Sequence, residues 1–96
     1  SPLATLASAG ADQQLTVDTT VGGVQLTAFD AATNYVYVNV QDQAARVTFD
    51  GSAPTTTNGH VFAAGYQELW SVALAEAAKF IRDNGTDAVV HATPLK

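Results

Sequence analysis

The stretch FDGSAPTTTNGH (residues 49–60) sets the plan of the chain, because it is a turn-rich loop between two apolar runs. Gly51 and Gly59 can supply backbone conformations with positive φ at no steric cost. Pro54 fixes its own φ and biases the residue before it toward an extended conformation. We therefore predict a loop of defined shape, with β-strands before and after it.

The runs that flank this loop alternate with a period of two, which is typical of half-buried strands. In YVYVNV (35–40), three valines fall on one face, and Tyr35, Tyr37 and Asn39 fall on the other. Apolar area on both faces predicts a central strand, or a strand whose outer face meets a partner. Residues 15–19 alternate in the same way, and Gly22-Gly23 favours a tight hairpin turn into a second strand over residues 24–29.

Residues 68–82 support two interpretations. Apolar side chains from Trp70 to Ile81 recur at helical spacing, whereas Asn84-Gly85, flanked by β-type runs, is a strong hairpin signal. A strand to about Val72, one helical turn within residues 74–77 and a strand through Arg82 reconciles the two.

Valine, threonine and a single isoleucine make up about a quarter of the chain, and β-branched side chains favour strands. We predict a mainly all-β fold, an antiparallel β-sandwich or barrel-like domain of about seven or eight short strands, with at most one short helix near residues 73–79. Residues 1–13 are small and aperiodic, which predicts an N-terminal arm that is either frayed or docked on a neighbouring subunit. Residues 14–96 then form a single β domain.

The charge balance disfavours nucleic acid and membrane partners. The 96 residues include four basic and nine acidic ones, for a net charge of −5, and residues 1–45 contain no Lys or Arg. Without cysteine there is no disulfide or thiolate chemistry, so a small domain must be stabilised by packing or by homo-oligomerisation. The chain has no apolar run of about 18 residues and begins without a basic signal-peptide region, so we expect an intracellular origin.

No catalytic motif rises above background, and we expect a non-enzyme with no cofactor and no metal site. Ser71, His60 or His91, and one of the aspartates could be combined into a catalytic triad, but any protein of this size offers such a combination, and we do not adopt it. We interpret His60 as a structural loop histidine, with a pH-sensitive contact or a metal ligand as alternatives, and His91 as a partly exposed strand residue. The polar residues of the 83–87 turn lack the ordered spacing of a calcium loop.

An aromatic cluster, Phe62, Tyr66 and Trp70, surrounds Gly65. Such clusters are most often core, which is the interpretation we adopt. The alternative is an aromatic surface for a sugar, with Tyr66 and Trp70 as stacking platforms.

Over residues 35–95 the chain resembles small β-rich virion proteins of tailed bacteriophages, of the capsid decoration or cement type. The resemblance rests on short motifs: VTFDG (47–51), PT (54–55), GH (59–60), AG (64–65), FIR (80–82) and GTDA (85–88). It implies a compact β-sandwich or barrel-like domain that binds the outside of a phage head, often as a symmetric oligomer. The helical segment at 73–79 departs from a purely β pattern.

The resulting expectation is a non-enzymatic structural protein on the capsid surface of the virion, made in the host cytoplasm. Its partners would be the major capsid protein or another virion protein, and copies of itself. An acidic protein would be repelled by the packaged genome, which favours the outer surface. The alternative is a small glycan- or surface-binding β module of a phage fibre or tail. The predicted partner-binding residues, which include part of the loop at 51–60, are Leu3, Leu6, Tyr35, Tyr37, Pro54, Thr55 and His60.

Overall fold

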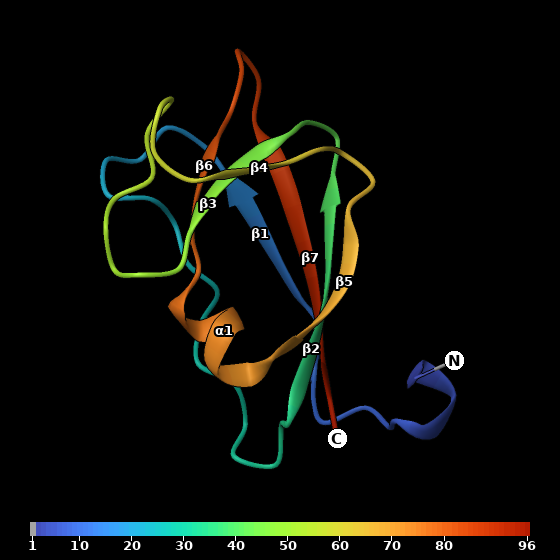
Figure 1. Ribbon diagram of the computed structural model, residues 1–96. Helices are drawn as coiled ribbons and strands as arrows, with labels where there is room; N and C mark the ends of the chain where they lie inside the picture. Colours follow the sequence, from blue (N-terminus) through green and yellow to red (C-terminus); the bar gives the residue numbers. More distant parts are fainter. Residues whose placement is uncertain (1) are drawn as a thin grey trace.

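The computed structural model describes residues 2–96, and in that range it has seven β-strands, one α-helix and one 3₁₀ turn (Figure 1). In chain order the elements are η1 (Pro2–Thr5), β1 (Gln13–Val17), β2 (Tyr35–Gln41), β3 (Ala45–Thr48), β4 (His60–Phe62), β5 (Gln67–Ser71), α1 (Val72–Ala77), β6 (Lys79–Arg82) and β7 (Ala88–Leu95). The predicted all-β class, with one short helix, is confirmed.

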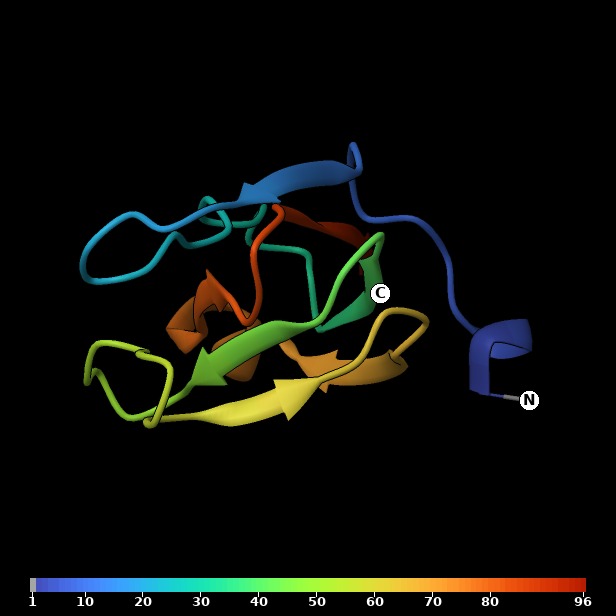
Figure 2. The same cartoon turned by 90° about the horizontal axis from the view of Figure 1, so that it is seen from above.

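The strands form two antiparallel sheets that pack as a sandwich (Figure 2). Sheet A has four strands in the order β1-β7-β2-β5, and sheet B has three in the order β4-β3-β6. Strand β2 lies inside sheet A, between β7 and β5. The prediction that residues 35–40 form a central strand is therefore confirmed.

The core lies between the sheets and follows the period-two pattern of the strands. Val36, Val38 and Val40 of β2 are fully buried, whereas Tyr35, Tyr37 and Asn39 point to the other side. Phe80 of β6 is the largest fully buried side chain. The buried apolar residues are Val17, Leu26, Val36, Val38, Val40, Ala45, Val47, Trp70, Ala75, Ala78, Phe80, Ala88, Val90 and Ala92.

The predicted hairpin at Gly22-Gly23 is wrong, because the strand before the turn does not pair with residues 24–29. The turn itself forms, since both glycines have positive φ and Gly23 N donates to Thr20 O at 2.9 Å. However, β1 pairs with β7, and residues 24–29 contribute only an isolated bridge from Val24 to Phe80. The turn therefore leads from sheet A across to sheet B, because a long-range strand partner replaced the local one.

Residues 67–82 form the predicted strand, short helix and strand. Ser71 caps α1, since its Oγ accepts a hydrogen bond from Leu74 N at 3.1 Å. The helix buries Ala75, and Ala78 follows it in the core. Asn84-Gly85, by contrast, does not close a hairpin, because β6 belongs to sheet B and β7 to sheet A. This turn connects the two sheets.

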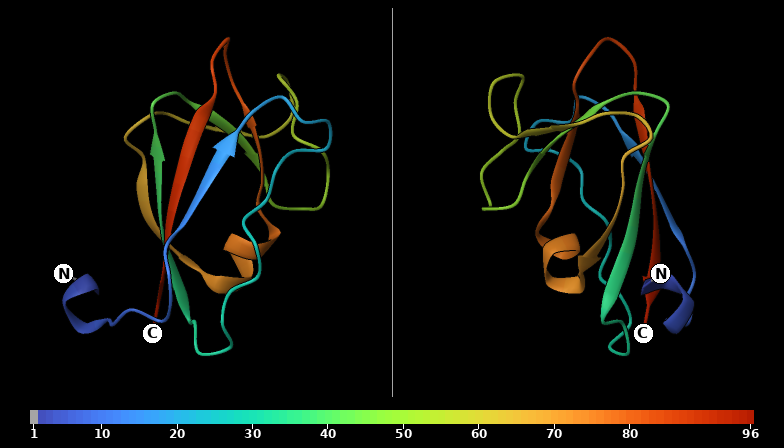
Figure 3. Two further views of the ribbon diagram at one scale, coloured as in Figure 1. Left: turned by 180° about the vertical axis from the view of Figure 1, so that it is seen from behind. Right: turned by 45° about the vertical axis from the view of Figure 1, so that its right-hand side comes forward.

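The N-terminal segment is anchored at one point and then leaves the domain. Ala7 and Lys96 exchange two backbone hydrogen bonds, of 2.9 and 2.8 Å, and Ala9 N donates to Pro94 O at 2.9 Å. Residues 2–6 project beyond both sheets in Figure 1 and in the left view of Figure 3. Residue 1 of the predicted arm lies outside the described residues, and Gln13 already begins β1. We call residues 2–6 the arm.

Thr33 gives the first testable prediction. It is buried, and its Oγ1 has no hydrogen-bond partner among residues 2–96. Because a buried hydroxyl without a partner costs free energy, Thr33→Val should leave the free energy of unfolding unchanged or raise it by up to about 1 kcal/mol. Thr48 is the matched control, equally buried but with Oγ1 donating to Ser52 O at 2.6 Å. Thr48→Val should lose about 1–3 kcal/mol. Equal losses in urea denaturation of the two variants would contradict this account.

Candidate functional site

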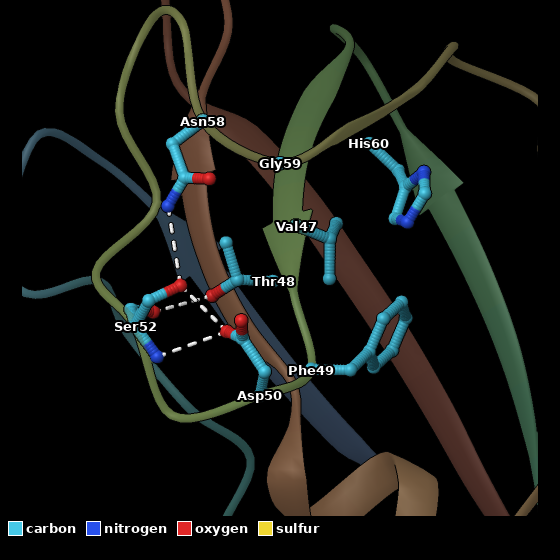
Figure 4. A pocket seen from close by; sticks show the side chains of 8 residues that line it. All are labelled: Val47, Thr48, Phe49, Asp50, Ser52, Asn58, Gly59 and His60. Atoms are coloured by element: carbon cyan, nitrogen blue, oxygen red, sulfur yellow. Dashed lines mark hydrogen bonds between the residues drawn. The ribbon is translucent and has the colours of Figure 1, made fainter.

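A network of short hydrogen bonds holds the loop at 49–60 in shape (Figure 4). Asp50 Oδ1 accepts from the backbone N and the Oγ of Ser52, at 3.0 and 2.5 Å. Asn58 Nδ2 donates to Ser52 Oγ at 3.1 Å and to Ala53 O at 2.9 Å. Gly51 and Gly59 have φ values of +88° and +122°. The prediction of a shaped loop built on these glycines is confirmed.

This loop encloses an open depression of about 410 Å³. Its polar side chains, which include Thr48, Asp50 and Asn58, lie on one side of β3, and the rings of Phe49 and His60 lie on the other (Figure 4). Because the polar groups hydrogen-bond within the loop, they fix its shape. The depression therefore presents a rigid surface with an exposed histidine at its edge.

Aromatic rings continue from this depression into the core. The ring of Phe62 stacks on Tyr66 with centroids 4.2 Å apart, and Trp70 meets Phe49 edge-on at 5.2 Å. Trp70 is only 4% exposed, and its Nε1 donates to the Tyr66 hydroxyl at 3.0 Å. The core interpretation of Trp70 is confirmed. Its alternative role as a sugar-stacking platform is wrong, because no face of the ring is available to a ligand.

The side of sheet A that faces away from the core is the second candidate site, and we call it the outer face. The strand registers place one set of side chains on it: Gln14 and Thr16 of β1, Val89, His91, Thr93 and Leu95 of β7, Tyr35, Tyr37, Asn39 and Gln41 of β2, and Gln67, Leu69 and Ser71 of β5. No Asp, Glu, Lys or Arg occurs among these strand residues.

One charged group reaches the outer face from its rim. Asp12 precedes β1, and its Oδ2 lies 2.9 Å from Nε2 of His91. The outer side of sheet B differs, because Arg46 and Lys79 share it and Arg46 pairs with Asp83 at 2.9 Å. The charges of the domain are therefore distributed unevenly between its two sheets.

Tyrosine and leucine side chains gather at one end of the outer face. Tyr35 lies opposite Leu95 in the register and is 43% exposed. Tyr37 lies opposite Leu69, and its hydroxyl donates to Gln67 Oε1 at 2.6 Å. The arm leaves the domain at the same end, where Ala7 pairs with Lys96 (Figure 3). Leu3 of the arm is 43% exposed.

The structure thus divides the predicted partner-binding residues into three groups. Tyr35 and Tyr37 share the outer face, and Leu3 and Leu6 belong to the arm. Thr55 is exposed in the loop at 49–60, and His60 is exposed where that loop ends and β4 begins; both lie at the other end of the molecule from the arm (Figure 2).

Pro54 requires a correction. It is fully buried and packs beside Gly23, so closely that a Cβ on that glycine would lie 2.9 Å from its Cγ. Its side chain is not available to a partner. Sequence reasoning also missed Leu69, Thr93 and Leu95 as neighbours of the two tyrosines. The alternation of residues 88–95 indicated that Thr93 and Leu95 share one face of a strand. The strand register was needed to show that this face also holds the two tyrosines.

Three carboxyl groups have a lowered pKa in the folded protein. The hydrogen bond from His91 lowers the pKa of Asp12, and the Thr20 and Ser52 side chains do the same for Asp18 and Asp50. Two further acidic side chains form ion pairs with arginines. Asp83 pairs with Arg46, and Asp87 Oδ1 lies 2.7 Å from Arg82 Nη1. In the 83–87 turn, both acidic side chains are thus paired with arginines.

These pKa shifts predict a loss of stability in acid. A carboxyl group whose folded pKa is depressed contributes stability that is fully present above its ordinary pKa of about 4 and is lost as the pH falls through the lower folded value. We expect the melting temperature to fall between pH 5 and pH 2. In the triple variant D12N/D18N/D50N the fall should be smaller. Calorimetry at a series of pH values checks this, and an unchanged pH profile in the variant would contradict it.

The side chains considered for catalysis have other partners. Ser71 Oγ caps α1, and His91 pairs with Asp12 rather than with a serine. Within residues 2–96 there is no group of three His, Cys, Asp or Glu side chains placed to share a metal ion.

None of the helices described is long and apolar enough to span a bilayer. Comparison of the chain with models of known protein families, with curated protein sequences and with solved structures gives no match.

Proposed function

We propose that this chain is a non-enzymatic structural protein of a bacteriophage particle, which decorates or cements the outer surface of the capsid. The observation that carries the proposal is the outer face of sheet A, which lacks charged strand residues, exposes Tyr35 and ends beside the arm. Cores of protein–protein interfaces are depleted in charged residues and enriched in tyrosine.

A second exposed surface supports a bridging role. The loop at 49–60 lies at the opposite end of the molecule from the arm, and its shape is fixed by the hydrogen bonds of Asp50 and Asn58 (Figures 2 and 4). A cement protein has to touch two neighbours at once, and many symmetric copies make modest contacts effective. We assign Thr55 and His60 to the contact with the major capsid protein or another virion protein.

Charge and resemblance favour the outer surface of a phage head. A net charge of −5 disfavours contact with packaged DNA, which also carries negative charge. The motifs at 47–51, 54–55 and 59–60 all belong to β3, β4 and the loop between them, and they carry the resemblance to phage decoration proteins.

The proposal is tested on particles from the host that produces this chain. Antibodies raised against the purified chain should label intact particles, and the chain should co-sediment with particles that lack it. T55K/H60A should weaken co-sedimentation, whereas Thr86→Lys, in the exposed 83–87 turn, should not. A chain found inside the particle against the DNA, or a purified chain that turns over a substrate, would contradict the proposal.

A further inference from the structure

We propose that Asn84 is a site of spontaneous covalent modification, at which the side-chain amide of the folded protein is converted to a carboxylate. The chain has two Asn-Gly pairs, Asn58-Gly59 and Asn84-Gly85. Glycine after asparagine leaves its main-chain nitrogen open to attack the side chain before it, because glycine carries no Cβ. The structure gives the two pairs opposite environments. The inference goes beyond the proposed function and does not depend on it.

The reaction needs no other reactant than water. The main-chain nitrogen of Gly85 attacks Cγ of Asn84, so that an N–Cγ bond forms and the Cγ–Nδ2 bond breaks. The side-chain nitrogen leaves as ammonia, which takes up the proton that the main-chain nitrogen loses, and a five-membered succinimide ring remains. Water then opens the ring at one of its two carbonyls. The product is aspartate or isoaspartate at position 84, and nothing is oxidised or reduced.

The structure leaves Asn84 free to follow this path. The 83–87 turn forms the tip of the molecule at the top of Figure 1, and both Asn84 and Gly85 are exposed. The main chain is held up to Asp83, whose N donates to Ala44 O at 3.2 Å. Within residues 2–96, neither the Asn84 amide nor Gly85 N has a hydrogen-bond partner, and a Cβ added to Gly85 would meet no described atom within 4 Å. The amide can therefore rotate toward the attacking nitrogen without breaking a contact.

Asn58, by contrast, is held away from the same reaction. Its Nδ2 donates to Ser52 Oγ at 3.1 Å and to Ala53 O at 2.9 Å (Figure 4). Gly59 packs so closely against β3 that an added Cβ would lie 2.8 Å from Val47 O. Both side-chain hydrogen bonds must break before Cγ can turn toward the nitrogen of Gly59. Asn58 should therefore react only when the loop at 49–60 opens.

Modification of Asn84 would change the charge of the turn. The carboxylates on either side of it are already paired, Asp83 with Arg46 at 2.9 Å and Asp87 with Arg82 at 2.7 Å. A further carboxylate at position 84 would compete for these two arginines. Isoaspartate would also add a CH₂ group to the main chain where β6 of sheet B leads to β7 of sheet A. The modified chain should therefore separate from the unmodified chain in anion exchange.

Peptide mass analysis of the full chain, incubated at mildly alkaline pH and then cleaved after lysine and arginine, tests the inference. Residues 47–79 and 83–96 fall into separate peptides, each with a single asparagine. In the folded chain, peptide 83–96 should gain the mass difference between water and ammonia at least about tenfold faster than peptide 47–79. In urea the two rates should become similar, because unfolding removes the hydrogen bonds of Asn58.

Two variants provide the matched controls. Gly85→Ala should slow the reaction at position 84 severalfold, because the added methyl group hinders the approach of the nitrogen, and the open space around it leaves the fold intact. Ser52→Ala removes one of the two acceptors of Asn58 Nδ2, so it should speed the reaction at position 58 and leave position 84 unchanged. Circular dichroism verifies that both variants fold.

The inference is overturned if the folded chain reacts at position 58 as fast as at position 84. An unchanged rate at position 84 in Gly85→Ala would overturn it as well. Neither result bears on whether the chain binds particles, so the proposed function is tested separately.

Discussion

Replacing Phe80 with alanine is expected to lower the free energy of unfolding by about 3–5 kcal/mol. Phe80 is fully buried, stacks on Trp70 with ring centroids 6.2 Å apart, and lies opposite Val47 in the β3–β6 register. Phe80, on β6 of sheet B, therefore contacts sheet A through Trp70 of β5. A domain of this size is stable by only about 5–14 kcal/mol, so the variant should lose a large fraction of its stability.

The control for this variant is Val21→Ala. Val21 is 97% exposed, so its truncation removes almost no packing and should change stability by less than about 0.5 kcal/mol. Urea denaturation followed by the fluorescence of Trp70 measures both. A Phe80→Ala protein that unfolds at the midpoint of the unmodified chain would show that the two sheets do not depend on this contact.

The second large effect is expected at Gly59. Its φ is +122°, and a Cβ there would lie 2.8 Å from Val47 O in the neighbouring strand. Gly59→Ala therefore combines backbone strain with a clash against main-chain atoms, and should cost about 3 kcal/mol or more. The loop at 49–60 should become susceptible to proteases.

Gly51→Ala provides the comparison for Gly59→Ala. Gly51 also has positive φ, at +88°, but no atom lies within 4 Å of its added Cβ. Gly51→Ala should therefore lower the free energy of unfolding only by the cost of the backbone conformation, about 1–2 kcal/mol. Thermal unfolding and limited proteolysis compare the two variants. If both lose the same stability, the close approach of β3 to Gly59 does not contribute.

Local patterns in the sequence predicted the fold class and much of its layout. The valines of residues 35–40 identified a central strand, and residues 67–82 formed the predicted strand, helix and strand. These predictions were correct because they depend on the alternation of buried and exposed residues, which can be read from a few consecutive positions.

The two hairpin predictions failed for a shared reason. Gly22-Gly23 and Asn84-Gly85 are true turn signals, but in both places the chain crosses from one sheet to the other. A turn signal shows where the chain changes direction and leaves open which strand becomes the partner. Here β1 and β2 both found β7, at the far end of the chain.

The same limit applies to the candidate site. Tyr35 and Tyr37 were recognisable from their alternation with valine, but their neighbours Leu69 and Leu95 come from distant strands. Pro54 looked like a loop residue open to a partner, and it is buried because the loop folds back beside Gly23. The absence of charge from the outer face became visible only after the register was known.

The proposed role needs two separate contact surfaces on a rigid domain. In that role, the outer face and the loop at 49–60 would each contact a different neighbour in the particle. Ring contacts from Phe49 through Trp70 to Phe80 connect the loop at 49–60 to the packed core.

Hydroxyl-radical footprinting can compare the reactivity of the tyrosines in the particle-bound protein with their reactivity in the free chain. The chain has three tyrosines, two on the outer face and one, Tyr66, in the aromatic cluster. If the outer face of sheet A is a contact surface, Tyr35 and Tyr37 should lose reactivity on assembly, whereas Tyr66 should keep its own. Unchanged reactivity of Tyr35 and Tyr37 in the assembled state would contradict it.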